Sequence, residues 1–302
     1  MKTAFIFPGQ GAQFVGMGKE FYDKYQEARE VFEAANRVSG LNLEQICFEE
    51  NDEINQTEYT QIAMLTVEIA MLKAVLKEGI KPDICAGLSL GEYGALAACE
   101  AMEVDELLGL VRNRGIYMQN AYPTGGAMTA VLGMEGSEVQ RICNETPGEV
   151  YVANYNCPGQ IVISGKDDAV AKAAEELSKN GAKRCIPLKV SGPFHSPLLN
   201  EASEKLAKDL SQVTIKKPQI PYYTNVGARL IDSNEEIADL LAKQVVSSVM
   251  WQQSVEAMVA QGVDTFVEIG PGKTLQGFIK KIAPEAKVFT IGKPEDIDAL
   301  KA

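Results

Sequence analysis

Residues 83–99 read DICAGLSLGEYGALAAC, and this stretch decides the fold class. Residues 83–86 predict a short buried strand, and the alanine-rich residues 91–99 predict a helix. Between them stands Gly87-Leu88-Ser89-Leu90-Gly91, a G-x-S-x-G motif in the strand–turn–helix context of a nucleophile elbow. Such a tight turn needs small flanking residues, which glycine supplies. The turn would present the Ser89 hydroxyl at a helix N-terminus, where backbone N–H groups stabilise developing negative charge.

A serine hydroxyl is a weak nucleophile at neutral pH and needs a base. His195 is the only histidine in the chain, and we interpret it as that base. No acid between Ser89 and His195 stands out as a third member, because Asp167 and Asp168 fall inside a predicted insert. We therefore expect a Ser–His dyad whose second imidazole nitrogen is oriented by a backbone carbonyl or a side-chain amide. The alternative is a histidine without a catalytic role.

Two backbone N–H groups are candidates for an oxyanion hole. The loop Pro8-Gly9-Gln10-Gly11 follows a predicted strand over residues 3–7, and its Gln10 is flanked by glycines. Leu90 follows the nucleophile, which is the usual position of the second donor. The alternative for the loop is a plain tight turn. It is not a phosphate-binding loop, because it lacks the Gly-Lys-Ser/Thr ending.

Arg114 is the candidate for acyl selection. It lies in a helix predicted over residues 105–120, after the elbow helix. A guanidinium can hold a carboxylate with two parallel hydrogen bonds. If it faces the cleft, Arg114 would select an acyl group that carries a free carboxylate. The alternative is an ordinary surface arginine.

The rest of the chain alternates strands with helices, which predicts an α/β fold with a mostly parallel sheet covered on both faces. Long helices are predicted over residues 17–38 and 57–77. Further strands are predicted at 221–224, 265–269 and 287–291.

The pattern changes after Tyr122-Pro123-Thr124-Gly125-Gly126. Strands are predicted at 127–132, 150–154, 160–164 and 183–190, with helices at 137–144 and 168–179. This β-α-β-β-α-β order is ferredoxin-like. We expect a subdomain of residues 125–190, inserted into a large α/β domain of residues 1–124 and 191–302 that resumes near Ser191.

Composition narrows the class of protein. The chain has 302 residues, is 46% hydrophobic and 23% charged, and carries a net charge of −12, which disfavours a nucleic-acid partner. We find no apolar run near the roughly 18 residues that span a bilayer and no signal peptide, so we expect a cytoplasmic protein. Six cysteines without CxxC pairs predict free thiols, and a single histidine disfavours zinc.

An acidic protein partner would need a local basic patch on this acidic chain. There are two candidates, and the alternative for both is solvated surface charge: Lys183, Arg184 and Lys189, and Lys273, Lys280 and Lys281.

The chain resembles the malonyl-CoA–acyl carrier protein transacylases of bacterial fatty-acid synthesis, which are related to the acyltransferase domains of polyketide synthases. The resemblance covers essentially the whole chain. It rests on motifs in the right order: Phe7-Pro8-Gly9-Gln10-Gly11, Gly87-Leu88-Ser89-Leu90-Gly91-Glu92, Arg114-Gly115 with Met118-Gln119, Asn156-Cys157-Pro158-Gly159-Gln160, Gly192-Pro193-Phe194-His195-Ser196, Asn225-Val226, Gln244 ahead of Trp251, and Gly270-Pro271-Gly272.

The resemblance implies an α/β-hydrolase-like large domain with a ferredoxin-like insert. It implies that malonyl-CoA acylates Ser89, with His195 as base, and that the malonyl group then passes to the phosphopantetheine thiol of acyl carrier protein. This step supplies fatty-acid biosynthesis in lipid metabolism. Arg114 would bind the malonyl carboxylate, and Gln244 would help to orient the catalytic pair.

The same resemblance implies that the amides of Gln10 and Leu90 form the oxyanion hole. Asn156 would line the substrate site, and Phe194 would narrow the acyl pocket in favour of malonyl over branched acyl groups. Coenzyme A enters as a thioester substrate, so no cofactor or metal is implied. The expected partners are malonyl-CoA and acyl carrier protein, bound through a local basic patch, with no nucleic acid and no membrane. We expect a monomer.

One position departs from the family pattern, which usually has histidine before the nucleophile where this chain has Leu88. The missing imidazole is not the general base, so we expect the dyad to survive. We expect Leu88→His to change malonyl affinity or rate by roughly 1 kcal/mol in either direction, about the net value of one hydrogen bond. A change beyond about a hundredfold in kcat/KM would contradict this.

Three other functions fit parts of the pattern. A serine esterase or thioesterase would share the elbow and the histidine, because hydrolysis and transfer share an acyl-enzyme. Arg114 argues against it, since a generic esterase has little use for a carboxylate clamp. A docking module without activity would not need Ser89, His195 and Arg114 together. A transferase for acetyl or another acyl group would be expected to lack Arg114.

Overall fold

A six-stranded sheet forms the centre of the larger part of the molecule in the computed structural model, which describes residues 2–190 and 192–301. The strand order is β10-β9-β1-β2-β7-β8, and every neighbouring pair is parallel except β7 with β8. The strands are β1 (Thr3–Phe7), β2 (Ile84–Gly87), β7 (Tyr222–Thr224), β8 (Arg229–Ile231), β9 (Thr265–Ile269) and β10 (Lys287–Ile291).

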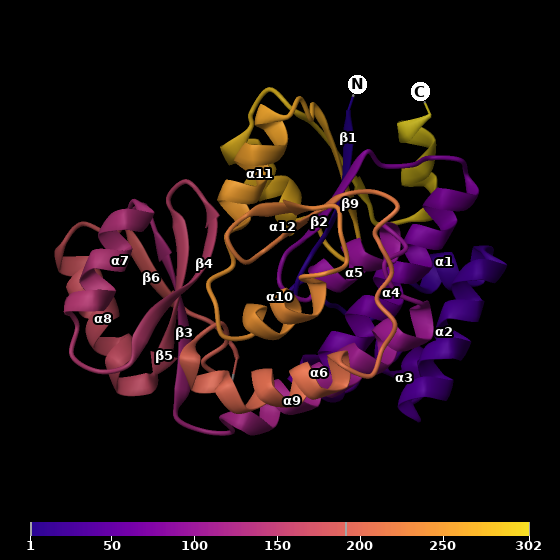
Figure 1. Cartoon of the computed structure of the whole chain (residues 1–302). Coiled ribbons are helices and arrows are strands. Elements are labelled where there is room, and N and C mark those ends of the chain that lie inside the picture. The colour runs from indigo at the N-terminus through magenta and orange to yellow at the C-terminus, as the bar shows by residue number, and fades with distance from the viewer. Residues whose placement is uncertain (1, 191, 302) are drawn as a thin grey trace.

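Both faces of this sheet are buried, as the sequence predicted for a mostly parallel sheet. Strand β1 is buried at all five positions, so it reads as a continuous apolar run. Its alternate residues enter different cores: Phe5 and Phe7 lie in one hydrophobic cluster, and Ala4 and Ile6 lie in another. Strand periodicity of two therefore holds two layers of helices against one sheet (Figure 1).

The first cluster receives side chains from helices α1 (Lys19–Lys24), α2 (Gln26–Ser39), α3 (Leu43–Phe48), α4 (Thr57–Lys77), α5 (Gly91–Ala98), α6 (Val104–Ala121), α9 (Asn200–Leu210) and α10 (Ile237–Gln244). The second receives them from α11 (Trp251–Ala260) and α12 (Thr274–Ile282). Three 3-10 turns complete the helical set: η1 (Glu53–Asn55), η2 (Pro197–Leu199) and η3 (Pro294–Leu300).

The prediction of a single helix over residues 17–38 is wrong, because the helix is interrupted at Tyr25. The Tyr25 backbone is extended, with φ −112° and ψ 127°, and it separates α1 from α2. The Arg29 guanidinium donates to the backbone oxygens of Tyr22 (2.8 Å) and Asp23 (3.1 Å), which supplies the carbonyls at the end of α1 with a donor. Helix α3 and the edge strand β8 were not predicted from the sequence.

Helix α4 begins and ends where the sequence predicted, yet it corrects another expectation. Its 21 residues are long and apolar enough to cross a membrane, with a hydropathy of 1.4 over an 18-residue window, so the chain does contain such a run. Within the protein, 83% of that window is buried. A helix that is apolar all round and covered on all sides is a core helix.

A separate four-stranded antiparallel sheet lies beside the larger part (Figure 1). Its elements follow in the expected β-α-β-β-α-β order, and the strand order in space is β4-β5-β3-β6. The elements are β3 (Gly126–Leu132), α7 (Gly136–Glu145), β4 (Val150–Cys157), β5 (Gln160–Lys166), α8 (Asp167–Lys179) and β6 (Arg184–Pro187). Strand β6 is shorter than expected, ending at Pro187, and Ser191 lies outside the described residues.

Hydrogen bonds join the small sheet to the segment between α10 and α11 of the larger part. The Val249 N–H donates to the Ala153 oxygen (2.8 Å), and the Tyr155 N–H donates to the Val249 oxygen (2.9 Å). One face of the small sheet packs against α7 and α8. Its other face contributes Met128 and Val162 to the first core cluster of the larger part. The small sheet is therefore in direct contact with the core of the larger part.

Candidate active site

Ser89 occupies a strained turn between β2 and α5. Its φ is 55°, in the left-handed region that residues with a side chain seldom adopt. A Cβ added to Gly87 would lie 1.9 Å from the Gly91 oxygen, and one added to Gly91 would lie 2.1 Å from the Phe7 oxygen. Both flanking positions therefore require glycine, which is the reason the elbow motif has its spacing.

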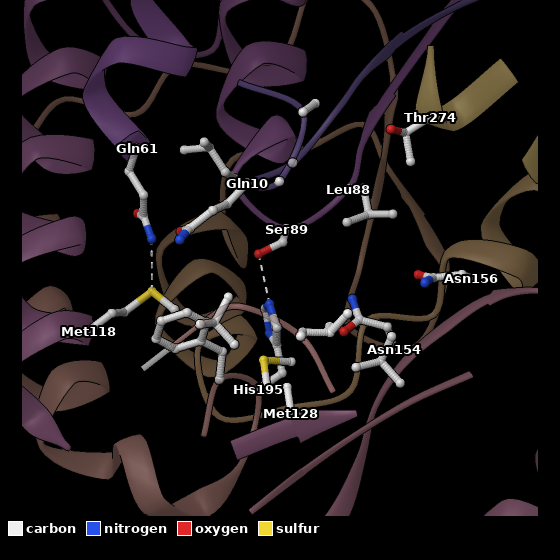
Figure 2. Close-up of a pocket in the computed structure, with 18 of the residues that line it drawn as sticks. Gln10, Gln61, Leu88, Ser89, Met118, Met128, Asn154, Asn156, His195 and Thr274 are labelled. Atoms are coloured by element: carbon white, nitrogen blue, oxygen red, sulfur yellow. Dashed lines mark hydrogen bonds between the residues drawn. The ribbon is translucent and has the colours of Figure 1, made fainter. Parts of the chain in front are cut away.

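The structure brings Ser89 and His195 together across 106 residues of sequence. The Ser89 Oγ and the His195 Nε2 are 2.7 Å apart (Figure 2). The other ring nitrogen, Nδ1, lies 2.9 Å from the backbone oxygen of Gln244. Because a carbonyl oxygen only accepts, Nδ1 carries the proton and Nε2 is free to accept from the serine. The neutral acceptor expected in place of a third acidic residue is this backbone carbonyl.

The environment keeps His195 neutral. The side chain is buried, and this burial lowers the pKa of His195 to about 4, with the charge of Arg114 adding to the effect. The hydrogen bond to the Gln244 carbonyl opposes the shift. An imidazole that stays unprotonated at neutral pH is able to accept the serine proton.

Arg114 is 1% exposed, so the alternative of a surface arginine is wrong. It lies on α6, and its Nη2 is 3.3 Å from the Ser89 Oγ. Its Nη1 donates to the Gln61 Oε1 (2.7 Å) and its Nη2 to the Gln244 Oε1 (2.9 Å). Its Nε has no partner, and no carboxylate of residues 2–190 and 192–301 forms an ion pair with it. A buried cation next to the nucleophile thus still has donors to offer an anion.

Two amide side chains hold the elbow. The Asn225 Oδ1 accepts from the Ser89 N–H (2.6 Å), and the Asn225 Nδ2 donates to the Gly87 oxygen (2.6 Å). The Gln244 Nε2 donates to the Ser89 oxygen (3.0 Å). Neither Asn225 nor Gln61 was expected to have a role from the sequence. Only Asn225 had a signal in the sequence, because it belongs to a family motif. The contacts themselves join residues that are far apart in sequence, so no short stretch of sequence reveals them.

The two predicted oxyanion donors line the same cavity as Ser89. Gln10 and Leu90 both border it, and in the part of the chain that the structure describes neither backbone N–H donates to a backbone oxygen. The Gln10 side chain is held separately, since its Nε2 donates to the Thr57 Oγ1 (3.0 Å). Their role in stabilising an oxyanion stays a prediction.

The cavity has a volume of about 220 Å³ and is mostly apolar away from the dyad. Two residues singled out from the sequence border it: Leu88, where we expect an effect on malonyl affinity or rate, and the 6%-exposed Phe194, which we expect to narrow the acyl pocket. Asn156 borders it too, and its Oδ1 has no partner among the described residues. Further lining residues, mostly missed by the sequence analysis, are Met118, Met128, Asn154, Val162, Leu188, Thr274 and Phe278, several of them labelled in Figure 2.

Potential metal ligands do not gather at this site. Residues 2–190 and 192–301 contain no group of three or more His, Cys, Asp or Glu side chains that could hold a metal ion. All six cysteines are free, and only Cys185 is partly exposed.

Comparison with known proteins places this geometry in a family. Residues 4–291 match the family described as "Acyl transferase domain". The malonyl CoA-acyl carrier protein transacylase of Bacillus subtilis (strain 168) is 43% identical over 98% of this chain and 95% of its own length. The crystal structure of the transacylase of that name from Clostridium perfringens is 42% identical, covers 100% of this chain and 96% of its own, and superposes with a TM-score of 0.96.

A third relative was solved with a partner. A malonyl-transacylase in complex with its type II polyketide synthase acyl-carrier protein is 34% identical, covers 99% of this chain and 98% of its own, and superposes with a TM-score of 0.96. Matches of this identity and extent establish common descent as well as a common fold. The chain belongs to the malonyl-CoA–acyl carrier protein transacylase family.

Proposed function

We propose that this chain is an [acyl-carrier-protein] S-malonyltransferase, which moves a malonyl group from malonyl-CoA to the phosphopantetheine thiol of acyl carrier protein for fatty-acid synthesis. One observation carries the proposal. The Ser89 Oγ that faces the His195 base at 2.7 Å also lies 3.3 Å from the buried Arg114 guanidinium. A nucleophile between a base and a carboxylate-binding cation is suited to a carboxylated acyl group.

The first half-reaction acylates the serine. His195 Nε2 takes the Ser89 proton as Oγ attacks the thioester carbon, and the N–H groups of Gln10 and Leu90 donate to the oxyanion. The carbon–sulfur bond then breaks. The imidazolium returns its proton to the departing thiolate, coenzyme A leaves, and malonyl-Ser89 remains.

The second half-reaction runs the same steps with a different thiol. His195 takes the proton of the phosphopantetheine thiol, and the sulfur attacks the malonyl ester carbon. The carbon–oxygen bond breaks, and the proton passes to Ser89 Oγ. One base serves both directions because the thioester made is chemically equivalent to the thioester consumed, so we expect ping-pong kinetics.

Arg114 contributes binding and a change in the base. Its charge lowers the pKa of His195. A malonyl carboxylate on the guanidinium would offset that charge and make His195 a stronger base in the complex. An acetyl group cannot do this. The clamp therefore favours malonyl in the chemical step as well as in binding.

Carrier-protein binding is assigned to the basic residues beside the cleft. Leu188 and Thr274 border the cavity, and they neighbour Lys189 and Lys273 in sequence. Six basic residues form no ion pair with the described residues, so their charges are available to an acidic partner. They are Lys183, Arg184, Lys189, Lys273, Lys280 and Lys281. The relative solved with its acyl-carrier protein supports this kind of partner.

We also propose how the chain divides into domains. We assign an α/β-hydrolase-like large domain to residues 1–124 and 191–302 and an inserted ferredoxin-like subdomain to residues 125–190. The β-α-β-β-α-β order and the strand order β4-β5-β3-β6 support the second assignment. We further propose a monomeric, cytoplasmic enzyme that needs no cofactor or metal, in keeping with the burial of α4.

The test mixes the enzyme with malonyl-CoA and holo acyl carrier protein and follows free coenzyme A and malonyl-carrier protein together. Equal amounts of both products, with parallel double-reciprocal lines, are expected. Coenzyme A released without malonyl-carrier protein would instead identify a hydrolase, which shares the acyl-enzyme but resolves it with water. Intersecting lines would contradict the malonyl-serine intermediate.

A further inference from the structure

Glu92 is a buried carboxyl group that the steps above do not use. It is the second residue of α5, directly behind the elbow, and its side chain has no exposed surface. Its Oε2 accepts from the Gln244 Nε2 (2.6 Å) and from the Asn225 backbone N–H (3.1 Å). A buried carboxyl group is costly, so its retention here calls for a reason.

The contact between Glu92 and Gln244 gives a reason for a carboxyl group at this position. The Gln244 side-chain amide lies between a cation and a carboxyl group: its Oε1 accepts from the Arg114 Nη2 (2.9 Å), and its Nε2 donates to Glu92. The two ends of an amide have nearly the same shape, so the neighbouring groups decide which end points where. The nitrogen end donates to Glu92 at 2.6 Å, its shortest contact, and to the Ser89 oxygen at 3.0 Å, and the oxygen end is then directed at the guanidinium.

We infer that Glu92 is a positioning residue for acyl selection, which fixes the Gln244 amide and thereby keeps Arg114 directed at the acyl group. The inference rests on the proposed role of Arg114. Because Glu92 acts through an amide, it does not occupy the guanidinium as a direct ion pair would. Burial raises the pKa of Glu92 to about 7, and the hydrogen bond from Gln244 opposes that rise.

The alternative is that Glu92 matters only as a negative charge near a buried cation, and two neutral substitutions separate the two ideas. Glu92→Gln keeps an acceptor oxygen for the two donors, whereas Glu92→Met removes it. Both remove the charge equally. The readout is the ratio of kcat/KM for malonyl-CoA to kcat/KM for acetyl-CoA, with KM and kcat reported separately in the full-length enzyme.

This ratio is insensitive to two kinds of damage. A smaller folded fraction lowers both rates equally, and so does a displaced elbow, because Ser89 serves both substrates. A misdirected Arg114 lowers only the malonyl rate. We expect Glu92→Met to reduce the ratio by roughly tenfold, mainly through KM for malonyl-CoA, about the value of one charge-assisted hydrogen bond. Glu92→Gln should stay within about threefold of the unsubstituted enzyme.

Two results would overturn the inference. Equal loss in both variants would mean that charge alone matters, and an unchanged ratio in Glu92→Met would mean that Gln244 needs no support from Glu92. In a Gln244→Met background, Glu92→Met should lower the ratio no further, and an additional loss would also count against it. An unsubstituted enzyme without malonyl preference would contradict the proposed function itself, so the two failures are distinguishable.

Discussion

The larger part of the molecule and the small antiparallel sheet contribute different things to one cleft. The larger part supplies the polar groups: Ser89, His195 and Arg114 are each held by hydrogen bonds from distant elements. The small sheet supplies none of these three groups and contributes wall instead: Met128 on β3, Val162 on β5, and the amides of Asn154 and Asn156 on β4. From this contrast we expect the polar network to govern reactivity and the wall to govern how the acyl group fits.

If this division is right, substitutions in the polar network should have large effects that depend on the acyl group or on pH, and substitutions in the wall should have small ones. The largest effect is expected for His195→Ala. Without the base, the serine is a weak nucleophile, and kcat/KM for malonyl transfer should fall by a factor on the order of 10³ or more. Transfer assays check this, and a loss of only about tenfold would assign the base elsewhere.

Arg114→Ala should have the next largest effect. We expect malonyl transfer to fall by roughly a hundredfold, while acetyl transfer falls much less or rises, because only malonyl has a carboxylate to lose. Arg112→Ala is the matched control. Arg112 lies on the same helix but pairs with Glu58 at 3.1 Å, away from Ser89, and its removal should leave the malonyl-to-acetyl ratio unchanged. If the two variants had equal malonyl-to-acetyl ratios, Arg114 would not be the group that selects the malonyl carboxylate.

The pH dependence should report the buried dyad. In the free enzyme the pKa of His195 is lowered to about 4, so the base stays unprotonated as pH falls below the ordinary value near 6.5. The acid limb of kcat/KM should therefore lie near pH 4. The limb of kcat should lie higher, because bound malonyl offsets the charge of Arg114.

The measurement is a pH profile of kcat/KM and of kcat. It is best repeated in Glu92→Gln, because burial raises the pKa of Glu92 to about 7, within the range scanned. A kcat/KM limb near pH 6.5 in both proteins would contradict the account, because it would mean that water solvates the histidine and that its pKa is not lowered.

The smallest effect is expected on the wall. Met128→Leu nearly conserves volume, so stability should change by less than about 1.5 kcal/mol and kcat/KM for malonyl-CoA by less than about tenfold. Thermal unfolding and steady-state kinetics check the two numbers. A loss as large as that of Arg114→Ala, in a variant that folds normally, would erase the distinction between polar network and wall.

The sequence predicted those parts of the molecule that have local signals. The elbow, the bounds of α4 and the change of pattern at the small sheet follow from motif spacing and from hydrophobic periodicity within short windows. The break at Tyr25 was missed because side-chain contacts from Arg29, rather than a proline or glycine, stabilise it.

The residues that support the site could not be predicted from short windows of the sequence. Glu92 and Gln244 are 152 residues apart, and Ser89 and Asn225 are 136 apart. Ser89 and Asn225 meet because the parallel strands β2 and β7 end at the same edge of the sheet, and Glu92 and Gln244 meet through helices α5 and α10. The sequence could name a nucleophile and a base by their chemistry, whereas the groups that hold them have no chemistry that distinguishes them from any other amide or carboxyl group.

The central claim is that malonyl is carried on Ser89, and intact-protein mass after brief mixing with malonyl-CoA tests it most directly. We predict a single malonyl adduct on the unsubstituted enzyme, no adduct on Ser89→Ala, and a shift from malonyl toward acetyl on Arg114→Ala when both thioesters are offered. A malonyl adduct that persists in Ser89→Ala, or coenzyme A released steadily with no adduct at all, would contradict the account.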